Sequence, residues 1–313
     1  MSKTINLIVK NKISPFKKRI KVDSDKSLSI RSFLIGAISQ NKSYVKNVLE
    51  SDDVLSTIKC LKKLKVKITK IKSKNYVIYG NGLGSLQASK NLKLNFGNSG
   101  TLARLLIGIL TTTKNIEIIM SGDKSLNKRN MKKLIDLMSQ FGATFLPKKK
   151  YTLPLKMISS MMPIGINYKA GVSAQLKSAV ILAGLNSFGN TTIEEKNFSR
   201  NHTENILKKN KKSIKIYGTT KKIIKIFGKN NLQPLKINVP SDPSSAAFFT
   251  ALTLLNKGSE LIIKNVGLNP TRIGFYKLLK AQGSHIKFKN LKNINKEVIG
   301  VGRMLYGTGL RAY

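Results

Sequence analysis

The sequence predicts an α/β fold made of repeated βαβαββ units, and two observations lead to this prediction. Short strands alternate with apolar helices along the 313-residue chain. Serine-bearing turns that open helices also recur at Ser27, Ser99, Ser173 and Ser244, a spacing of roughly 70 residues. Because solenoid repeats are shorter, ~20–50 residues, each repeat here is expected to be a small module of strands and helices.

The first two repeats share one plan of strand, turn, helix, strand and helix. The first is predicted to have a strand at Val22, a turn at 26–31, helices at 33–38 and 54–64 and a strand at 44–49. The second is predicted to have strands at 94–96 and 116–120, a turn at 97–101, a helix ending at Leu110 and a helix at 131–141.

The third and fourth repeats follow the same plan. The third is predicted to have a strand at 166–168, a turn at 171–173, a helix at 175–185 and a helix opening at 203–207. The fourth is predicted to have strands at 237–239 and 261–266, a turn at 241–244 and helices at 246–255 and 271–279. Its opening, Val239-Pro240-Ser241-Asp242-Pro243-Ser244, parallels Val22-Asp23-Ser24-Asp25-Lys26-Ser27 of the first repeat.

Each repeat therefore places a polar turn at the start of a helix. A helix N-terminus carries about half a positive charge and unpaired N–H groups. Ser and Asp in such turns are ordinary caps when each is taken alone. If several of these helices converge, however, their N-termini form an anion-binding site.

The charge of the chain leaves three interpretations open. Lys and Arg number 57 against 14 Asp and Glu, a net charge of +43. Such a protein can bind nucleic acid, bind small anionic substrates, or carry dispersed surface lysines. The lysines are dispersed and no helix-turn-helix, zinc finger or aromatic RNA-binding motif is found, so we expect anionic small molecules and no specific nucleic acid as partners.

Few residues are available for metal or redox chemistry. Cys60 is the single cysteine and lies in a helical pattern with Val54, Ile58 and Leu61, so we expect a buried core thiol. We expect no metal and no cofactor. The sequence has no apolar run of the ~18 residues that cross a membrane, and no secretory signal peptide. We therefore expect a cytoplasmic monomer that does not bind membranes.

Several short motifs carry the chemistry. Lys26-Ser27-x-Ser29-x-Arg31 supplies charges and hydroxyls suited to a phosphate or carboxylate. Gly97-Asn98-Ser99-Gly100-Thr101-x-x-Arg104 is a glycine-bearing loop that leads into a helix. Gly122-Asp123-Lys124-Ser125-Leu126 precedes Arg129, and Ser173-Ala174-Gln175-x-Lys177 forms the third turn. The loop Ser199-Arg200-Asn201-His202-Thr203-Glu204 follows it.

Together with Ser51-Asp52-Asp53-Val54, these motifs resemble the enolpyruvyl transferase family, specifically the second, glyphosate-tolerance-associated class of its shikimate-pathway branch. The resemblance is nearly continuous from Val22 to about Lys287. It implies transfer of the enolpyruvyl group from phosphoenolpyruvate to the 5-hydroxyl of shikimate 3-phosphate, which releases phosphate. The sister enzyme that acts on UDP-N-acetylglucosamine is an alternative, but its cysteine-bearing loop has no counterpart here. Cys60 lies in a different place.

The resemblance implies an inside-out α/β barrel, with helices inside and sheets outside. Residues 23–240 would form a first, substrate-binding lobe of three repeats. Residues 1–22 and 241–313 would form a partial second lobe, with an N-terminal strand and one repeat. The segment from about residue 300 contains no lysine, and we interpret it as an atypical tail from a frameshift or early stop.

The resemblance also implies the site residues. Shikimate 3-phosphate would contact Lys26, Ser27, Arg31, Ser173, Ala174, Gln175 and Arg200. Phosphoenolpyruvate would contact Lys26, Asn98, Gly100, Arg129 and Gln175. Some glyphosate-tolerant members carry Ala at the position of Gly100, which here leaves room for glyphosate.

The family's acid and base residues lie in two further repeats, beyond residue 313, so the catalytic residues are unknown and Lys26 is a possible contributor. Two alternatives follow: a catalytically inactive remnant, or a basic protein that binds polyanions.

Overall fold

The computed structural model describes residues 8, 13–294 and 297–306, and it divides the chain into two compact units. The large unit takes Asp23–Pro240 and Asn293–Glu297. The small unit takes the chain up to Val22, Ser241–Lys292 and the chain from Val298 onward. Each unit has its own buried apolar core.

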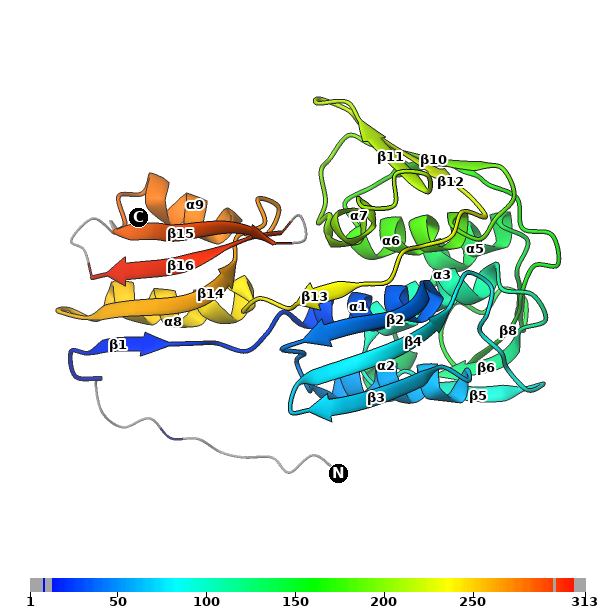
Figure 1. The fold of residues 1–313 in the computed structure, drawn as a ribbon, viewed down its shortest axis with the longest axis horizontal. Helices are drawn as coiled ribbons and strands as arrows, with labels where there is room; N and C mark the ends of the chain where they lie inside the picture. The colour runs from blue at the N-terminus through cyan, green and yellow to red at the C-terminus, as the bar shows by residue number, and fades with distance from the viewer. Residues whose placement is uncertain (1–7, 9–12, 295–296, 307–313) are drawn as a thin grey trace. The chain divides into compact units, whose positions relative to one another are not determined.

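The large unit contains three four-stranded sheets with one shared topology (Figure 1). The strands are counted here in the order of the module plan. The first strand pairs in parallel with the second, and the fourth strand lies between the second and the third and is antiparallel to both. A parallel pair needs a crossover connection, and a helix supplies it in the second and third modules, where α3 (Gly100–Thr111) and α6 (Ala174–Gly184) each join two parallel strands. The predicted βαβαββ module and the α/β fold class are confirmed.

The first module has an amphipathic outer helix and an apolar inner one. Its sheet consists of β13 (Lys236–Asn238), β2 (Gln40–Lys46), β4 (Asn75–Asn81) and β3 (Lys67–Lys72). Its helices are α1 (Lys26–Ile38) and α2 (Asp52–Lys63). In α1 every residue from Leu28 to Ile38 is buried, as expected of a helix that is surrounded by protein.

The second and third modules repeat this arrangement. The second consists of β5 (Leu92–Asn95), α3 (Gly100–Thr111), β6 (Glu117–Ser121), α4 (Lys124–Asn127), α5 (Lys132–Gln140), β7 (Thr144–Leu146) and β8 (Leu155–Ile158). The third consists of β9 (Asn167–Ala170), α6 (Ala174–Gly184), β10 (Asn190–Glu195), α7 (His202–Leu207), β11 (Ile214–Tyr217) and β12 (Lys222–Phe227).

Helices α1, α3 and α6 lie inside the large unit, and the three sheets lie outside them (Figure 1). A side chain at Gly108 of α3 would place its Cβ 2.5 Å from the carbonyl oxygen of Ala179 on α6, so only glycine permits this approach. This close packing brings the first turns of α3 and α6 together.

The small unit is a fourth module of the same kind. Its sheet runs in the order β1 (Lys17–Ile20), β14 (Glu260–Gly267), β16 (Glu297–Leu305) and β15 (Ile286–Ile294). Its helices are α8 (Pro243–Leu255) and α9 (Gly274–Ala281). Strand β16 pairs with β14 from Glu260↔Leu305 to Gly267↔Ile299, so residues 300–305 of the lysine-free segment form a strand of this sheet. Residues 307–313 of that segment lie outside the described residues.

The opening strands of the first and fourth modules differ from the prediction. Val22 is not in a strand, and the segment predicted to open the fourth module, β13, pairs in parallel with β2 of the first. The fourth sheet instead takes β1, which pairs in parallel with β14. Each of the two modules therefore receives its first strand from a remote part of the chain, because the polypeptide passes between the units at Val22 and Pro240.

None of the helices in the described ranges is long and apolar enough to span a bilayer.

Candidate functional site

Three capped helix starts carry the residues predicted to bind anions. The Asp25 carboxylate accepts from the Leu28 amide at 2.9 Å and begins α1. Ser99 accepts from the Leu102 amide at 3.2 Å and begins α3, and Ser173 accepts from the Leu176 amide at 3.4 Å and begins α6. Each cap satisfies one N–H and leaves other first-turn amides for a ligand.

The positions of two predicted turns are wrong. The segment 26–31 was expected to span a turn and the first helical turn, and it is helical throughout, because the cap of α1 is Asp25 and Ser27 is already in the first turn. Ser244 is likewise inside α8, where Asp242 is the cap and Pro243 is the first residue. In both helices the cap is an aspartate two residues before the serine, and the serine is already inside the helix. Pro243 also fixes the start of α8.

Arg31 joins three helices of the large unit. Its side chain is 3% exposed. Its Nε donates to Thr203 Oγ1 of α7 at 2.9 Å, Nη2 donates to Ser178 Oγ of α6 at 3.2 Å, and Nη1 donates to the Ser27 carbonyl at 3.1 Å. These bonds hold the planar guanidinium of Arg31 where α1, α6 and α7 meet.

Lys26 lies at the first position of α1, and its ammonium pairs with Asp53 of α2 at 2.9 Å. The side chain of Lys26 is 49% exposed, so the pair is open to solvent and can exchange for a ligand.

A second basic cluster surrounds the start of α3. Arg129 Nη2 donates to Asn98 Oδ1 at 2.9 Å, and Asn98 Nδ2 donates to Asp123 Oδ2 at 2.6 Å. Hydrogen bonds from the Leu126 amide and from Asn98 lower the pKa of Asp123 below its ordinary value of 3.8. The carboxylate therefore stays ionised and orients Asn98, which in turn holds Arg129.

Arg104 belongs to this cluster although it was not predicted as a site residue. Its Nη1 donates to the Gly100 carbonyl at 3.1 Å. Burial lowers the pKa of the Arg104 guanidinium, and the charge of Arg129 lowers it further. Within the described ranges neither arginine forms an ion pair with a carboxylate, so two like charges meet beside a helix N-terminus. Such a pair is suited to a dianion.

Gln175 connects the starts of α3 and α6, because its Nε2 donates to Thr101 Oγ1 at 2.9 Å. Arg104, Ser173 and Gln175 line one pocket of about 440 Å³. The structure therefore brings the two basic clusters together through α6, since Ser178 of the same helix contacts Arg31.

Ala174 and Arg200 complete the predicted set. Ala174 is the first residue of α6. Arg200 is exposed on the loop 196–201 between β10 and α7, next to the buried Ser199. This loop leads into Thr203, the residue that accepts from Arg31.

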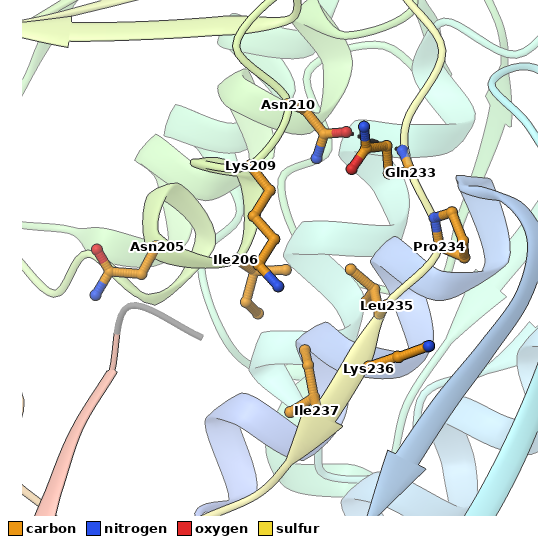
Figure 2. Close-up of a pocket in the computed structure, with 9 residues that line it drawn as sticks. All are labelled: Asn205, Ile206, Lys209, Asn210, Gln233, Pro234, Leu235, Lys236 and Ile237. Atoms are coloured by element: carbon orange, nitrogen blue, oxygen red, sulfur yellow. Dashed lines mark hydrogen bonds between the residues drawn. The ribbon is translucent and has the colours of Figure 1, made fainter. Parts of the chain in front are cut away.

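A smaller pocket of the large unit lies between α7 and the segment that leads into β13 (Figure 2). There the Gln233 amide donates to Asn210 Oδ1 at 2.8 Å. The pocket has a volume of about 30 Å³, which leaves room for only a few water molecules. None of the residues predicted to bind substrate lines it.

The chain matches a family model described as EPSP synthase (3-phosphoshikimate 1-carboxyvinyltransferase) over residues 10–309. The chain belongs to the EPSP synthase family. The family model extends into the lysine-free segment, up to residue 309.

Curated relatives agree with this assignment. The 3-phosphoshikimate 1-carboxyvinyltransferase of Zymomonas mobilis is 38% identical over 294 residues, which cover 93% of this chain and 64% of the relative. The enzyme of the same name from Caldicellulosiruptor bescii is 41% identical over 281 residues, which cover 89% of this chain and 64% of the relative. The chain therefore spans less than two thirds of the length of these relatives.

A solved structure of EPSP synthase from Acinetobacter baumannii has the same fold. It superposes with a TM-score of 0.83 at 34% identity, and the match covers 93% of this chain and 65% of that one. The predicted fold is thereby confirmed as that of EPSP synthases.

Proposed function

We propose that the large unit binds shikimate 3-phosphate and phosphoenolpyruvate, and that the chain serves the transfer of the enolpyruvyl group between them. The observation that carries the proposal is the convergence of α1, α3 and α6 around Arg31, Gln175 and Arg104. Helix N-termini and guanidinium groups are the usual protein ligands of phosphates and carboxylates.

The two substrates divide between the two basic clusters. Shikimate 3-phosphate takes Lys26, Ser27 and Arg31 on one side and Ser173, Ala174, Gln175 and Arg200 on the other. Phosphoenolpyruvate takes Asn98, Gly100 and Arg129, with Lys26 and Gln175 touching both substrates. Arg104 joins the second set because it is packed against Gly100.

In the proposed reaction the 5-hydroxyl of shikimate 3-phosphate adds to C2 of phosphoenolpyruvate while C3 accepts a proton. The phosphate group on C2, which came from phosphoenolpyruvate, then leaves together with one proton of C3, and the product is 5-enolpyruvylshikimate 3-phosphate. The contribution of the described residues is to bind both anions and to hold the reacting carbon beside the hydroxyl, which replaces a bimolecular encounter by a fixed geometry.

Calorimetric titration with shikimate 3-phosphate tests the proposal. We expect micromolar affinity for the wild-type chain, and a loss of at least tenfold for Arg31→Ala because a charge-assisted hydrogen bond contributes about 1.5–3 kcal/mol. The matched control is Arg303→Ala, which removes a 44% exposed arginine paired with Glu260 in the small unit. Thermal unfolding of each variant checks that it is folded.

A polyanion-binding function has one specific observation in its favour. On the outer face of the first sheet, the ammonium groups of Lys42 and Lys67 lie 5.5 and 5.0 Å from the ring centre of Tyr79. Binding of single-stranded oligonucleotide that falls steeply with salt, together with no binding of shikimate 3-phosphate by the wild-type chain, would favour this function over the proposed one.

A further inference from the structure

A lysine is fully buried between two carboxylates behind the proposed shikimate 3-phosphate site. Lys177 lies in the second turn of α6, Glu195 ends β10 and Glu204 lies in α7. The Lys177 ammonium is 2.7 Å from Glu195 Oε1 and 2.7 Å from Glu204 Oε1, and the three side chains are at most 1% exposed. A second cation, Lys222, approaches Glu195 Oε2 at 3.7 Å.

Stability alone does not account for this cluster. Taking three charges out of water is expensive, and well-packed apolar side chains of the same volume are often as stable or more so. Glu195 Oε2 and both oxygens of Glu204 have no hydrogen-bond partner of good geometry among the described residues. The hydrogen bonds of this cluster offset only part of the cost of removing its charges from water. We therefore look for a geometric role, in which the charges fix the position of another segment.

Glu195 holds that segment directly. Its Oε1 accepts from the Ser199 amide at 2.8 Å and from the Ser199 hydroxyl at 2.7 Å. Burial raises the pKa of Glu195, but hydrogen bonds from Lys177 and Ser199 outweigh burial and bring the pKa below its ordinary value of 4.5. The carboxylate is therefore ionised at neutral pH and is a strong acceptor for the loop.

Ser199 is the one buried residue of the loop 196–201. Asn201 is half-buried, and the other members of the loop are exposed: Lys196, Asn197, Phe198 and Arg200. One carboxylate oxygen therefore anchors the loop immediately before Arg200.

Adjacent residues of the same two helices hold Arg31. Thr203 precedes Glu204 and accepts from Arg31 at 2.9 Å, while Ser178 follows Lys177 and shares a 2.8 Å hydrogen bond with Thr203. Thr203 and Ser178 thus position Arg31. Their neighbours Glu204 and Lys177 are linked through Glu195 to the loop that carries Arg200.

We infer that Lys177, Glu195 and Glu204 are positioning residues for shikimate 3-phosphate, because they fix the loop 196–201 that carries Arg200. This inference rests on the proposed function.

Hydrogen exchange and calorimetry on the full chain test it with two variants. Ser199→Ala removes one hydroxyl and leaves the ionic cluster intact, and Glu195→Gln removes the charge that holds the loop. The matched control is Ser187→Ala, a buried serine beyond the end of α6 whose hydroxyl donates to the Gly184 carbonyl at 3.0 Å.

For Ser199→Ala we expect faster amide exchange confined to residues 196–201 and about three- to tenfold weaker binding of shikimate 3-phosphate, the equivalent of one hydrogen bond. Its melting temperature should match that of Ser187→Ala, which should bind like the wild type. Glu195→Gln should show a larger effect in the same direction wherever it folds.

Unchanged exchange of 196–201 in Ser199→Ala would overturn the inference. Faster exchange with unchanged affinity would overturn it as well, since the loop would then be ordered without serving the substrate. A wild-type chain that does not bind shikimate 3-phosphate would refute the proposed function separately. The exchange comparison needs no ligand, so it would still decide whether the cluster orders the loop.

Discussion

Gly100 and Arg129 are so close that a side chain at residue 100 would meet the Arg129 guanidinium. An ideal Cβ at Gly100 would lie 2.9 Å from Arg129 Nη1, and 2.8 Å from Arg104 Nη1 on the other side. Both obstructing atoms are the ends of flexible side chains, so a methyl group would displace the guanidinium groups and leave the backbone in place. The geometry of the proposed phosphoenolpyruvate subsite therefore depends on the absence of a side chain at residue 100.

Gly100→Ala should weaken binding of phosphoenolpyruvate and of glyphosate to the chain saturated with shikimate 3-phosphate. We expect about tenfold or more for each ligand, because displaced guanidinium groups lose charge-assisted hydrogen bonds. Affinity for shikimate 3-phosphate alone should stay within about twofold. Gly274→Ala is the control, since a Cβ there meets nothing within 4 Å. Unaltered affinity for both ligands in Gly100→Ala would remove Arg104 and Arg129 from the subsite.

Arg129→Ala should separate binding from stability. Removing one of two like charges relieves repulsion with Arg104, so we expect a free energy of unfolding within about 1 kcal/mol of the wild type, or higher. Phosphoenolpyruvate affinity should fall at least tenfold. The contrasting variant is Arg272→Ala, whose arginine pairs with Asp242 at 2.8 Å, and it should destabilise by about 1–3 kcal/mol. Urea unfolding measures the stability of both variants. A strongly destabilised Arg129→Ala would contradict the conclusion that Arg104 and Arg129 repel each other.

The lowered pKa of Asp123 gives a pH dependence of defined sign. Its stabilising hydrogen bonds are fully present above the unfolded pKa of 3.8, and they are lost as pH falls through the lower folded pKa. The difference in unfolding free energy between wild type and Asp123→Asn should thus be constant from about pH 7 to 5 and shrink below about pH 4.

The control for that series is Asp136→Asn, which removes an exposed ion pair of 2.8 Å with Lys132. Such an exposed pair contributes little to stability, because solvent screens it. A difference for Asp123→Asn that grows as pH falls would show that the sign is wrong.

Cys60 should be unreactive in the folded chain. The thiol is buried and donates to the Asn95 carbonyl at 3.4 Å, and burial raises its pKa from 9.0 to about 12. Because the thiolate is the reactive form, an aromatic disulfide reagent at pH 8 should modify Cys60 only at the rate of unfolding. In urea above the unfolding midpoint, one thiol per chain should react within the mixing time of a manual assay. Rapid modification of the native chain would mean that the core around α2 opens locally.

Much of the fold could be predicted from the sequence because the four modules repeat one local pattern. Helices such as α3 and α6 and strands such as β6 and β14 follow directly from apolar periodicity. The exchange of β1 and β13 between modules could not be predicted from that pattern. Strand pairing between remote segments depends on where the chain crosses between units, and the apolar pattern of a three-residue strand such as β13 does not encode this.

The candidate site divides in the same way. Arg31, Arg129 and Gln175 are predicted as site residues by the family resemblance that their motifs carry. Arg104 lies in one of these motifs, four residues after Gly100, but spacing alone did not reveal that its side chain returns to the Gly100 carbonyl. The burial of Lys177 could not be predicted either, because a buried lysine cannot be distinguished from a surface lysine in a chain with 57 basic residues.

A crystal structure of the chain with shikimate 3-phosphate tests the central claim most directly. The account predicts that the ligand lies within hydrogen-bond distance of Ser173 and Gln175 at the start of α6, with Arg31 and Arg200 facing its anionic groups. Density for the ligand on the outer face of a sheet, with the starts of α1, α3 and α6 empty, would contradict it.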